Sequence, residues 1–191
     1  MHEVGEAIET ILRVLKKSAE RGYIGEPVSQ LEHALQCAWF AGHTGADSEL
    51  VLAALLHDIG HLIAPDAPQM DGLGVLEHEK LGGAFLLELG FPQRLAHLVT
   101  AHVAAKRYLT FKYPAYLRKL SEASKGTLAW QGGPMTPGEG EAFEALPDFD
   151  SILALRKWDE MAKVVGLACH GLDYYEPMLR TCLIGQGDHR C

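Results

Sequence analysis

The feature that most constrains the fold is an apolar run that ends in a histidine and an aspartate. Residues 50–56 are all leucine, valine or alanine, so a helix over them is apolar on every side and belongs at the centre of the molecule. Asp47 is a good N-cap for this helix. His57 and Asp58 follow directly, about 100° apart around a helix, and they bind one ion only where both project into the same inter-helix space. The sequence therefore predicts a polar pocket at the end of the most buried helix.

Helical periodicity recurs along most of the chain. Helices are predicted over residues 6–17, 48–58, 77–89, 92–105 and 150–165, with a further helix from about Pro27 to about Gly42. No stretch of alternating polar and apolar residues appears. We therefore expect an all-α fold, in one domain over residues 1–191, with its core at about 6–165 and a frayed tail from about 186.

Two stretches rich in proline and glycine interrupt this pattern. Residues 63–76 read as a loop, and between residues 112 and 140 we expect at least one long ordered loop. Long loops in compact domains are often functional.

Charge and composition exclude several classes of protein. A net charge of −8 argues against nucleic acid as a partner, because binding to a phosphate backbone needs a basic face. No apolar run is long enough for a membrane span, and the first residues lack the pattern of a signal peptide, so a cytoplasmic location and no membrane partner are expected. The four scattered cysteines form no CxxC pair and are expected to be buried or incidental thiols.

Further histidines point to a metal site. His33, His78 and His102 each lie on a different predicted helix from His57, and Asp159 lies on the predicted helix 150–165. Burying four histidines with aspartates is costly unless they share a task. Imidazole and carboxylate ligands suit iron, manganese, zinc, nickel or cobalt, so the ligands alone leave the metal open. We assign no role to the other histidines, which are His2, His43, His97, His170 and His189.

Two cations are expected beside this site. Lys106 follows His102 by four residues, and Arg156 precedes Asp159 by three, so both lie on the helix faces that carry these ligands. An acidic protein that holds two cations at a metal site is suited to an anionic substrate.

The order of the candidate ligands is that of bimetallic HD-domain proteins. More specifically, the chain resembles the phosphonate-degrading branch of the HD-domain oxygenases from about residue 18 to residue 162. The segments that carry the resemblance are residues 23–26, 30–33, 52–58, 102–109 and 131–135. It implies a single HD-domain helical bundle with a central dimetal site. Two departures are Lys125-Gly126, in place of two basic residues, and the composition of the loop 66–73.

Members of that branch are mixed-valent diiron enzymes. They use O2 to oxidise a 1-hydroxy-2-aminoethylphosphonate and break its carbon–phosphorus bond, which gives phosphate and an amino acid. By resemblance, His33, His57, Asp58 and Asp159 bind one iron, while Asp58, His78 and His102 bind the other. The implied phosphonate-binding wall consists of His61, Lys106, Ser124, Thr127 and Arg156. Tyr23 and Glu26 match a lid pair whose tyrosine occupies an iron at rest and leaves when substrate enters.

Two alternatives stay open at this point. An HD-type phosphohydrolase acting on a small phosphoester or nucleotide would use the same six ligands, but it gives Tyr23 no role. Within the oxygenase reading, the substrate carries either a primary amine, which yields glycine, or a trimethylammonium group, which yields glycine betaine. Trp39, six residues beyond His33 on the same predicted helix, favours the trimethylammonium group, because aromatic faces bind cations that lack N–H donors.

Overall fold

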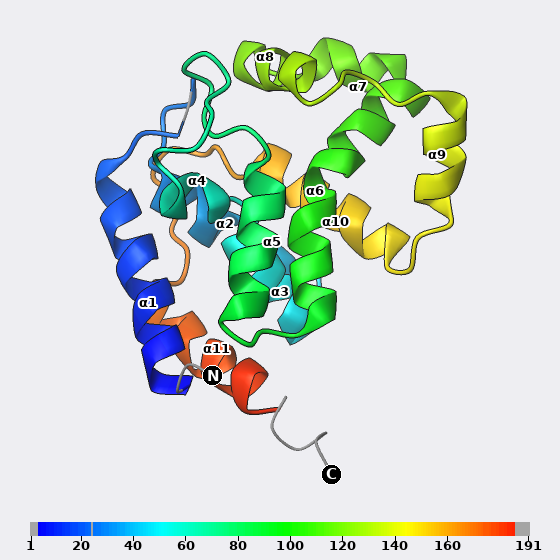
Figure 1. The fold of residues 1–191 in the computed structure, drawn as a ribbon. Coiled ribbons are helices and arrows are strands. Elements are labelled where there is room, and N and C mark those ends of the chain that lie inside the picture. The colour runs from blue at the N-terminus through cyan, green and yellow to red at the C-terminus, as the bar shows by residue number, and fades with distance from the viewer. Residues whose placement is uncertain (1–3, 24, 186–191) are drawn as a thin grey trace.

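The computed structural model describes residues 4–23 and 25–185, and these fold into eleven α-helices and a short 3-10 helix (Figure 1). They are α1 (Val4–Lys17), η1 (Ser18–Glu20), α2 (Gln30–His43), α3 (Ser48–Leu56), α4 (Gly60–Ile63), α5 (His78–Glu88), α6 (Gln93–Lys112), α7 (Pro114–Lys119), α8 (Glu122–Trp130), α9 (Pro137–Glu144), α10 (Phe149–Met161) and α11 (Leu172–Ile184). No strand occurs among the described residues, whose β pairing is limited to isolated bridges. The all-α prediction is confirmed.

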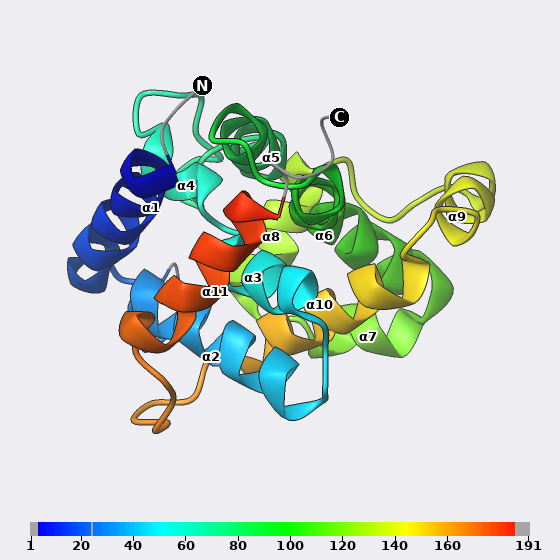
Figure 2. The same ribbon diagram turned by 90° about the horizontal axis from the view of Figure 1, so that it is seen from below.

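Helix α3 forms the centre of the core. Every residue of 50–56 is buried, and α2, α6, α10 and α11 all pack against this helix (Figure 2). Its N-cap is Asp47, as predicted, and the Asp47 side chain accepts a hydrogen bond of 3.0 Å from the backbone N–H of Leu50. His57 and Asp58 follow α3 directly, so they start from the interior of the molecule. Within the described part of the chain, no helix is long and apolar enough to cross a membrane.

Glycines allow α4, α5 and α6 to approach one another closely. A Cβ atom at Gly60 would lie 1.9 Å from the carbonyl oxygen of His78, so any other residue would push α4 away from the start of α5. A Cβ atom at Gly83 on α5 would likewise lie 2.1 Å from Oγ1 of Thr100 on α6. These close approaches hold the start of α5 beside α6, where His102 lies.

The region between residues 112 and 140 is the largest departure from the sequence prediction. In place of a long loop it contains α7, α8 and the start of α9, which lie at one side of the bundle and are joined by short connections (Figure 1). Pro114 and Pro137 occupy first-turn positions, where the missing N–H costs nothing, and Ser121 and Thr136 are N-caps. Pro114 and Pro137, which contributed to the prediction of a loop, therefore mark the starts of helices.

Three helix boundaries also differ from prediction by three residues or more, and the largest difference is in α6, which continues to Lys112 where the sequence predicted an end at about residue 105. Helix α2 begins at Gln30 rather than near Pro27, because Ser29 and Glu32 form a capping box that sets its start. Helix α10 ends at Met161, earlier than the predicted residue 165. Residues 63–76 hold no helix beyond Ile63, as expected.

The core extends beyond its predicted limit at residue 165. Helix α11, which the sequence reading missed, contains Pro177 and buries Tyr175, Leu179 and Leu183, and it packs against α1 and α3. The predicted frayed tail from about residue 186 lies outside the described residues.

Candidate metal centre

Six predicted ligand residues from separate parts of the chain meet at the buried end of α3. They are His33 on α2, His57 and Asp58 just after α3, His78 at the start of α5, His102 on α6 and Asp159 on α10. All four histidines and Asp159 are at most 4% exposed. Asp58 is the more accessible member, with 19% of its side chain exposed.

Asp58 lies between two pairs of histidines. Its Oδ2 atom is 3.4 Å from Nε2 of His57 and 3.8 Å from Nε2 of His33. Its Oδ1 atom is 3.4 Å from Nε2 of His78 and 3.6 Å from Nε2 of His102. Two donors that bind one ion at about 2.1 Å are about 3.0–3.4 Å apart. The first set of donors, Asp58 with His33 and His57, and the second set, Asp58 with His78 and His102, therefore each have nearly the spacing of a metal site. The two sets of donors therefore lie side by side and share Asp58.

The other ring nitrogen of each histidine is already used. Nδ1 donates to a backbone carbonyl oxygen in every case, and the acceptors for His33, His57, His78 and His102 are Ala162, Ala54, Val75 and Val99 at 2.8, 2.9, 3.3 and 2.7 Å. Such bonds fix the tautomer and aim Nε2 at the site, as outer hydrogen bonds do in metalloproteins.

The Nε2 atoms consequently face one another in pairs. They are 3.2 Å apart between His33 and His57, and 3.2 Å apart between His78 and His102. Two lone pairs at this distance repel unless a positive charge lies between them. Burial lowers the pKa of His57, but Asp58 outweighs this and raises it to about 9, so a proton takes the place of a cation. The donor set therefore fits metal ions, and an ion between His33 and His57 would replace this proton.

Asp159 completes the first set of donors. Its Oδ1 atom is 3.5 Å from Nε2 of His33. Burial alone would raise the pKa of Asp159, but the ion pair with Arg156 and the bond from His33 hold it well below its usual range. The carboxylate is thus ionised, as a metal ligand must be.

A cavity beside the two sets is lined by cations and hydroxyl groups. Its wall includes Lys106, Ser124, Thr127 and Arg156, all of them predicted for the phosphonate-binding wall. Nζ of Lys106 donates to Oγ1 of Thr127 at 2.7 Å. Burial, followed by repulsion from Arg156, lowers the pKa of Lys106 to about 7. Both cations are only 5% exposed. Arg156 is ion-paired with Asp159 and Glu160, which offset its charge, whereas Lys106 bonds to the neutral hydroxyl of Thr127, so an anion in this cavity would meet a lysine charge that water screens weakly.

His61 also lines the cavity, as a neutral donor. Its ring stacks on His78 with centroids 3.8 Å apart, and its Nδ1 accepts a hydrogen bond of 2.9 Å from the backbone N–H of Val75. Burial, followed by repulsion from His78, lowers the pKa of His61 to about 3. Because Nδ1 is an acceptor, the proton of the neutral ring is on Nε2, which can donate to a ligand.

Tyr23 and Glu26, the predicted lid pair, line the same cavity. The Tyr23 ring stacks on His33 with centroids 3.8 Å apart, and its hydroxyl donates to Oδ1 of Asp159 at 3.5 Å. Burial, with the nearby carboxylates Asp159 and Asp58, raises the pKa of Tyr23 well above its usual value. Glu26 is held by Lys163, whose Nζ is 2.9 Å from the Glu26 carboxylate.

Trp39 is not part of this cavity, and the prediction that placed it against the substrate is wrong. The indole packs on Phe40 and His43 and lines a separate hollow together with Tyr174 of α11. The physical reason is rotation around α2: six residues turn the side chain by about 600°, which leaves Trp39 about 120° away from His33.

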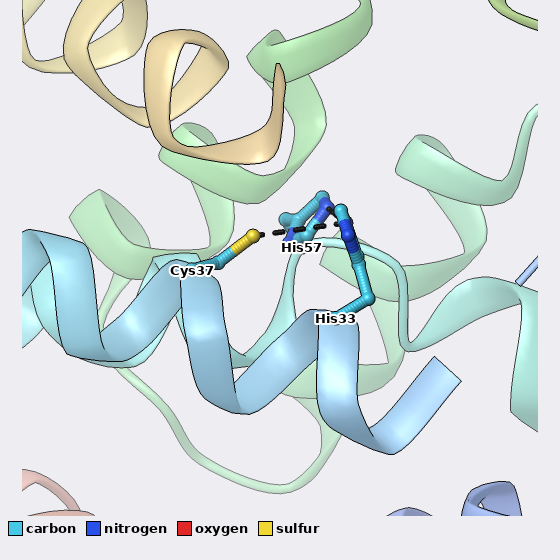
Figure 3. Close-up of side chains that lie close together, drawn as sticks. All are labelled: His33, Cys37 and His57. Carbon is cyan, nitrogen blue, oxygen red and sulfur yellow. Dashed lines mark hydrogen bonds between the residues drawn. The ribbon is translucent and has the colours of Figure 1, made fainter. Parts of the chain in front are cut away.

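The sequence reading missed two residues close to the first set. Lys163, beyond the end of α10, lines the cavity and pairs with Glu26, and no local signal marks it. Cys37 lies one turn after His33 on α2, and its Sγ atom is 3.6 Å from Nε2 of His33 (Figure 3). The four-residue spacing from His33 is a signal that could have identified Cys37.

Comparison with known proteins agrees with this arrangement. The sequence model of the HD domain family matches residues 30–137. The uncharacterised protein L432 of Acanthamoeba polyphaga mimivirus is 39% identical over 94% of this chain and 83% of its own length. The [1-hydroxy-2-(trimethylamino)ethyl]phosphonate dioxygenase (glycine-betaine-forming) of Leisingera caerulea is 38% identical over 92% of this chain and 90% of its own. The hydroxymethylphosphonate dioxygenase of Gimesia maris is 35% identical over 94% of this chain and 89% of its own.

Proposed function

This chain belongs to the HD-domain family and is an HD-domain dioxygenase, and from this premise we propose that it cleaves the carbon–phosphorus bond of a 1-hydroxy-2-aminoethylphosphonate or its trimethylammonio counterpart. O2 is the co-substrate, and the products are phosphate with glycine or glycine betaine. The observation that carries the proposal is the pairing of two histidine sets with the two oxygens of Asp58, directly beside a cationic wall.

The proposed cofactor is a mixed-valent pair of irons, Fe(II) and Fe(III). Nitrogen and oxygen donors suit iron, and the ligands are His33, His57, Asp58 and Asp159 for one ion, with Asp58, His78 and His102 for the other. When bound, this pair supplies the capacity to take up and activate O2. The protein's contribution is to hold the substrate beside it and to keep water out.

The phosphonate end of the substrate is proposed to bind at the cationic wall. Lys106 and Arg156 neutralise its charge, and Ser124 and the Nε2–H of His61 donate hydrogen bonds to its oxygens. Thr127 accepts a hydrogen bond from Lys106 and holds this cation in the wall. Arg156 is held in place by Tyr116, whose hydroxyl accepts from Nε of Arg156 at 2.8 Å. Fixed donors of this kind orient the substrate before reaction, which removes entropy from the barrier.

Tyr23 is proposed to occupy the first metal position at rest and to leave when substrate enters. Its stacking on His33 and its contact with Asp159 support this role. Glu26 is proposed to close the cavity around the substrate. Its carboxylate also offers the negative charge and the hydrogen-bond acceptors that a primary ammonium group requires. Since Trp39 lies in a separate hollow, it gives no reason to prefer the trimethylammonium substrate, and the proposal covers both amines.

The proposal is tested by following O2 and phosphate together. Iron-loaded protein is given hydroxymethylphosphonate, the primary amine or the trimethylated compound, with air and under strict anaerobiosis. We expect O2 uptake that matches phosphate release for at least one of the two amines. Equal phosphate release without O2 would instead identify a phosphohydrolase.

A matched pair of lysine variants links activity to the cavity. Lys106→Met removes a buried cation of the wall, whereas Lys112→Met, on the same helix α6, removes a lysine that is 45% exposed and pairs with Glu144. Only the first is expected to lose activity. Equal losses in both would show that Lys106 does not contact the substrate.

A further inference from the structure

A sulfur atom lies next to the first set of metal ligands. The side chains of His33, Cys37 and His57 each offer a donor atom, these atoms all lie within 4.8 Å of one another, and all three residues are buried. His33 and Cys37 project from successive turns of α2 toward His57, which follows α3 (Figure 3). Neither the carboxylates nor the histidines of the proposed iron position require this thiol.

The separations are those of a tetrahedral zinc site. With Zn–N bonds of about 2.05 Å and a Zn–S bond of about 2.3 Å, tetrahedral angles place two nitrogens about 3.3 Å apart and a nitrogen and a sulfur about 3.6 Å apart. The Nε2 atoms of His33 and His57 are 3.2 Å apart, and Sγ of Cys37 is 3.6 Å from Nε2 of His33. Both observed distances between donor atoms therefore fit one ion bound by two nitrogens and a sulfur.

The two ion positions differ in this respect. The second set, Asp58, His78 and His102, offers only nitrogen and oxygen. A thiolate favours zinc and other soft ions, whereas nitrogen and carboxylate ligands leave iron competitive. Zn²⁺ also stands above Fe²⁺ in the general order of affinities, so a sulfur donor adds to an existing advantage.

We propose that His33, Cys37 and His57 form a zinc-binding set that overlaps the first iron position, so that Zn²⁺ displaces iron there and inactivates the enzyme. Zinc is the occupant because its preferred geometry and donors match this set. On coordination the Zn–S bond replaces the S–H bond, and the proton passes to the buffer. Zinc carries no redox chemistry, so a molecule with zinc at this position has lost one of its two irons. The inference uses the proposed iron position but not the proposed reaction.

Cobalt(II) provides a direct readout, because it accepts zinc ligands and absorbs in the near ultraviolet when a thiolate is bound. Metal-free protein is titrated with Co²⁺ and then with Zn²⁺ at constant pH. We expect a thiolate-to-cobalt band in the wild type that Zn²⁺ abolishes. The band should be absent in Cys37→Ser and present in the control Cys182→Ser, which changes a part-buried cysteine of α11.

Zinc affinity gives the second measurement, by competition with a chromophoric chelator. Cys37→Ser should bind Zn²⁺ at least about tenfold more weakly than the wild type, while its Fe²⁺ affinity changes by less than about threefold. Thermal unfolding checks that the variant is folded, and Cys37→Ala replaces it if it is not. The absence of a cobalt–thiolate band in the wild type, or equal zinc affinities, would overturn the proposal. A cobalt–thiolate band and tight zinc binding in a protein whose iron-loaded form has no phosphonate activity would contradict the proposed function and leave the zinc-binding set standing.

Discussion

Nε2 of His78 and Nε2 of His102 face each other 3.2 Å apart, although both rings already donate their Nδ1 proton to the backbone. Oδ1 of Asp58 lies on the same side of both, at 3.4 and 3.6 Å. The two Nε2 lone pairs repel at this distance, and a cation between them would relieve the repulsion; Asp58 offers its second oxygen to His33 and His57 in the same manner. The carboxylate is thus the one group common to both sets.

Replacing the shared ligand should therefore affect both metals. Asp58→Ala is expected to lose both ions, whereas His102→Ala should deplete mainly the second, because His102 belongs to one set only. Both variants should also be less stable, since each leaves buried partners unpaired. Metal per protein, measured by elemental analysis after desalting, decides the matter. Full occupancy in Asp58→Ala would mean that another residue bridges the ions.

The low pKa of Lys106 predicts a pH dependence of substrate binding. Burial and then Arg156 lower this pKa to about 7, so the ammonium loses its proton as the pH rises through that value. The bound phosphonate favours the protonated form, and KM should accordingly rise above about pH 7 and be lowest below it. Bound metal ions would move the transition to lower pH, because they add positive charge.

The phosphonate group of the substrate titrates in the same pH range as Lys106. An arginine at position 106 distinguishes the effect of the lysine on the KM profile from that of the phosphonate. Lys106→Arg keeps its charge at every accessible pH, so the part of the KM profile caused by the lysine should disappear. Lys106→Met should lower kcat/KM about ten- to a hundredfold, the worth of one hydrogen bond to a charged group. Identical pH profiles for wild type and Lys106→Arg would argue against this assignment.

Tyr23→Phe isolates the hydroxyl of the proposed lid. The variant retains the ring that stacks on His33 but loses the group 3.5 Å from Asp159. If Tyr23 is an iron ligand at rest, the ferric wild type should show a tyrosinate-to-iron absorption band that substrate abolishes, and the variant should lack it. The same band in Tyr23→Phe would show that a different residue is responsible.

Gly60 is expected to control the second ion position through the backbone. In Gly60→Ala the new Cβ would collide with the carbonyl oxygen of His78, so α4 and α5 must separate. We expect a loss of about 1–3 kcal/mol in the free energy of unfolding, together with weaker retention of the second metal. The control is Gly42→Ala in α2, where a Cβ meets nothing within 4 Å and alanine should be neutral or stabilising. Chemical denaturation and metal analysis measure both effects.

The sequence by itself determined the features that depend on local chemistry. The apolar run 50–56 after the N-cap Asp47 predicts a buried helix, and His57 and Asp58 then start at its inner end. The order of the other ligands along separate helices was equally readable. Helical rotation also explains why Cys37 lies beside His33 and Trp39 does not. Cys37, four residues after His33, lies about 40° around the helix from it, whereas Trp39, six residues after His33, lies about 120° away.

Only the tertiary structure decided what meets across the site. Lys163 pairs with Glu26 although 137 positions separate them, and it lies beyond the end of α10, where no helical rule places a side chain. The short helices α7 to α9 had their caps and first-turn prolines in the sequence, but packing decided that Thr127 would bond to Lys106 and that Ser124 would line the same cavity. Local propensity sets where a helix begins and which face is apolar; which helices meet depends on burying those faces together, and that is a property of the whole chain.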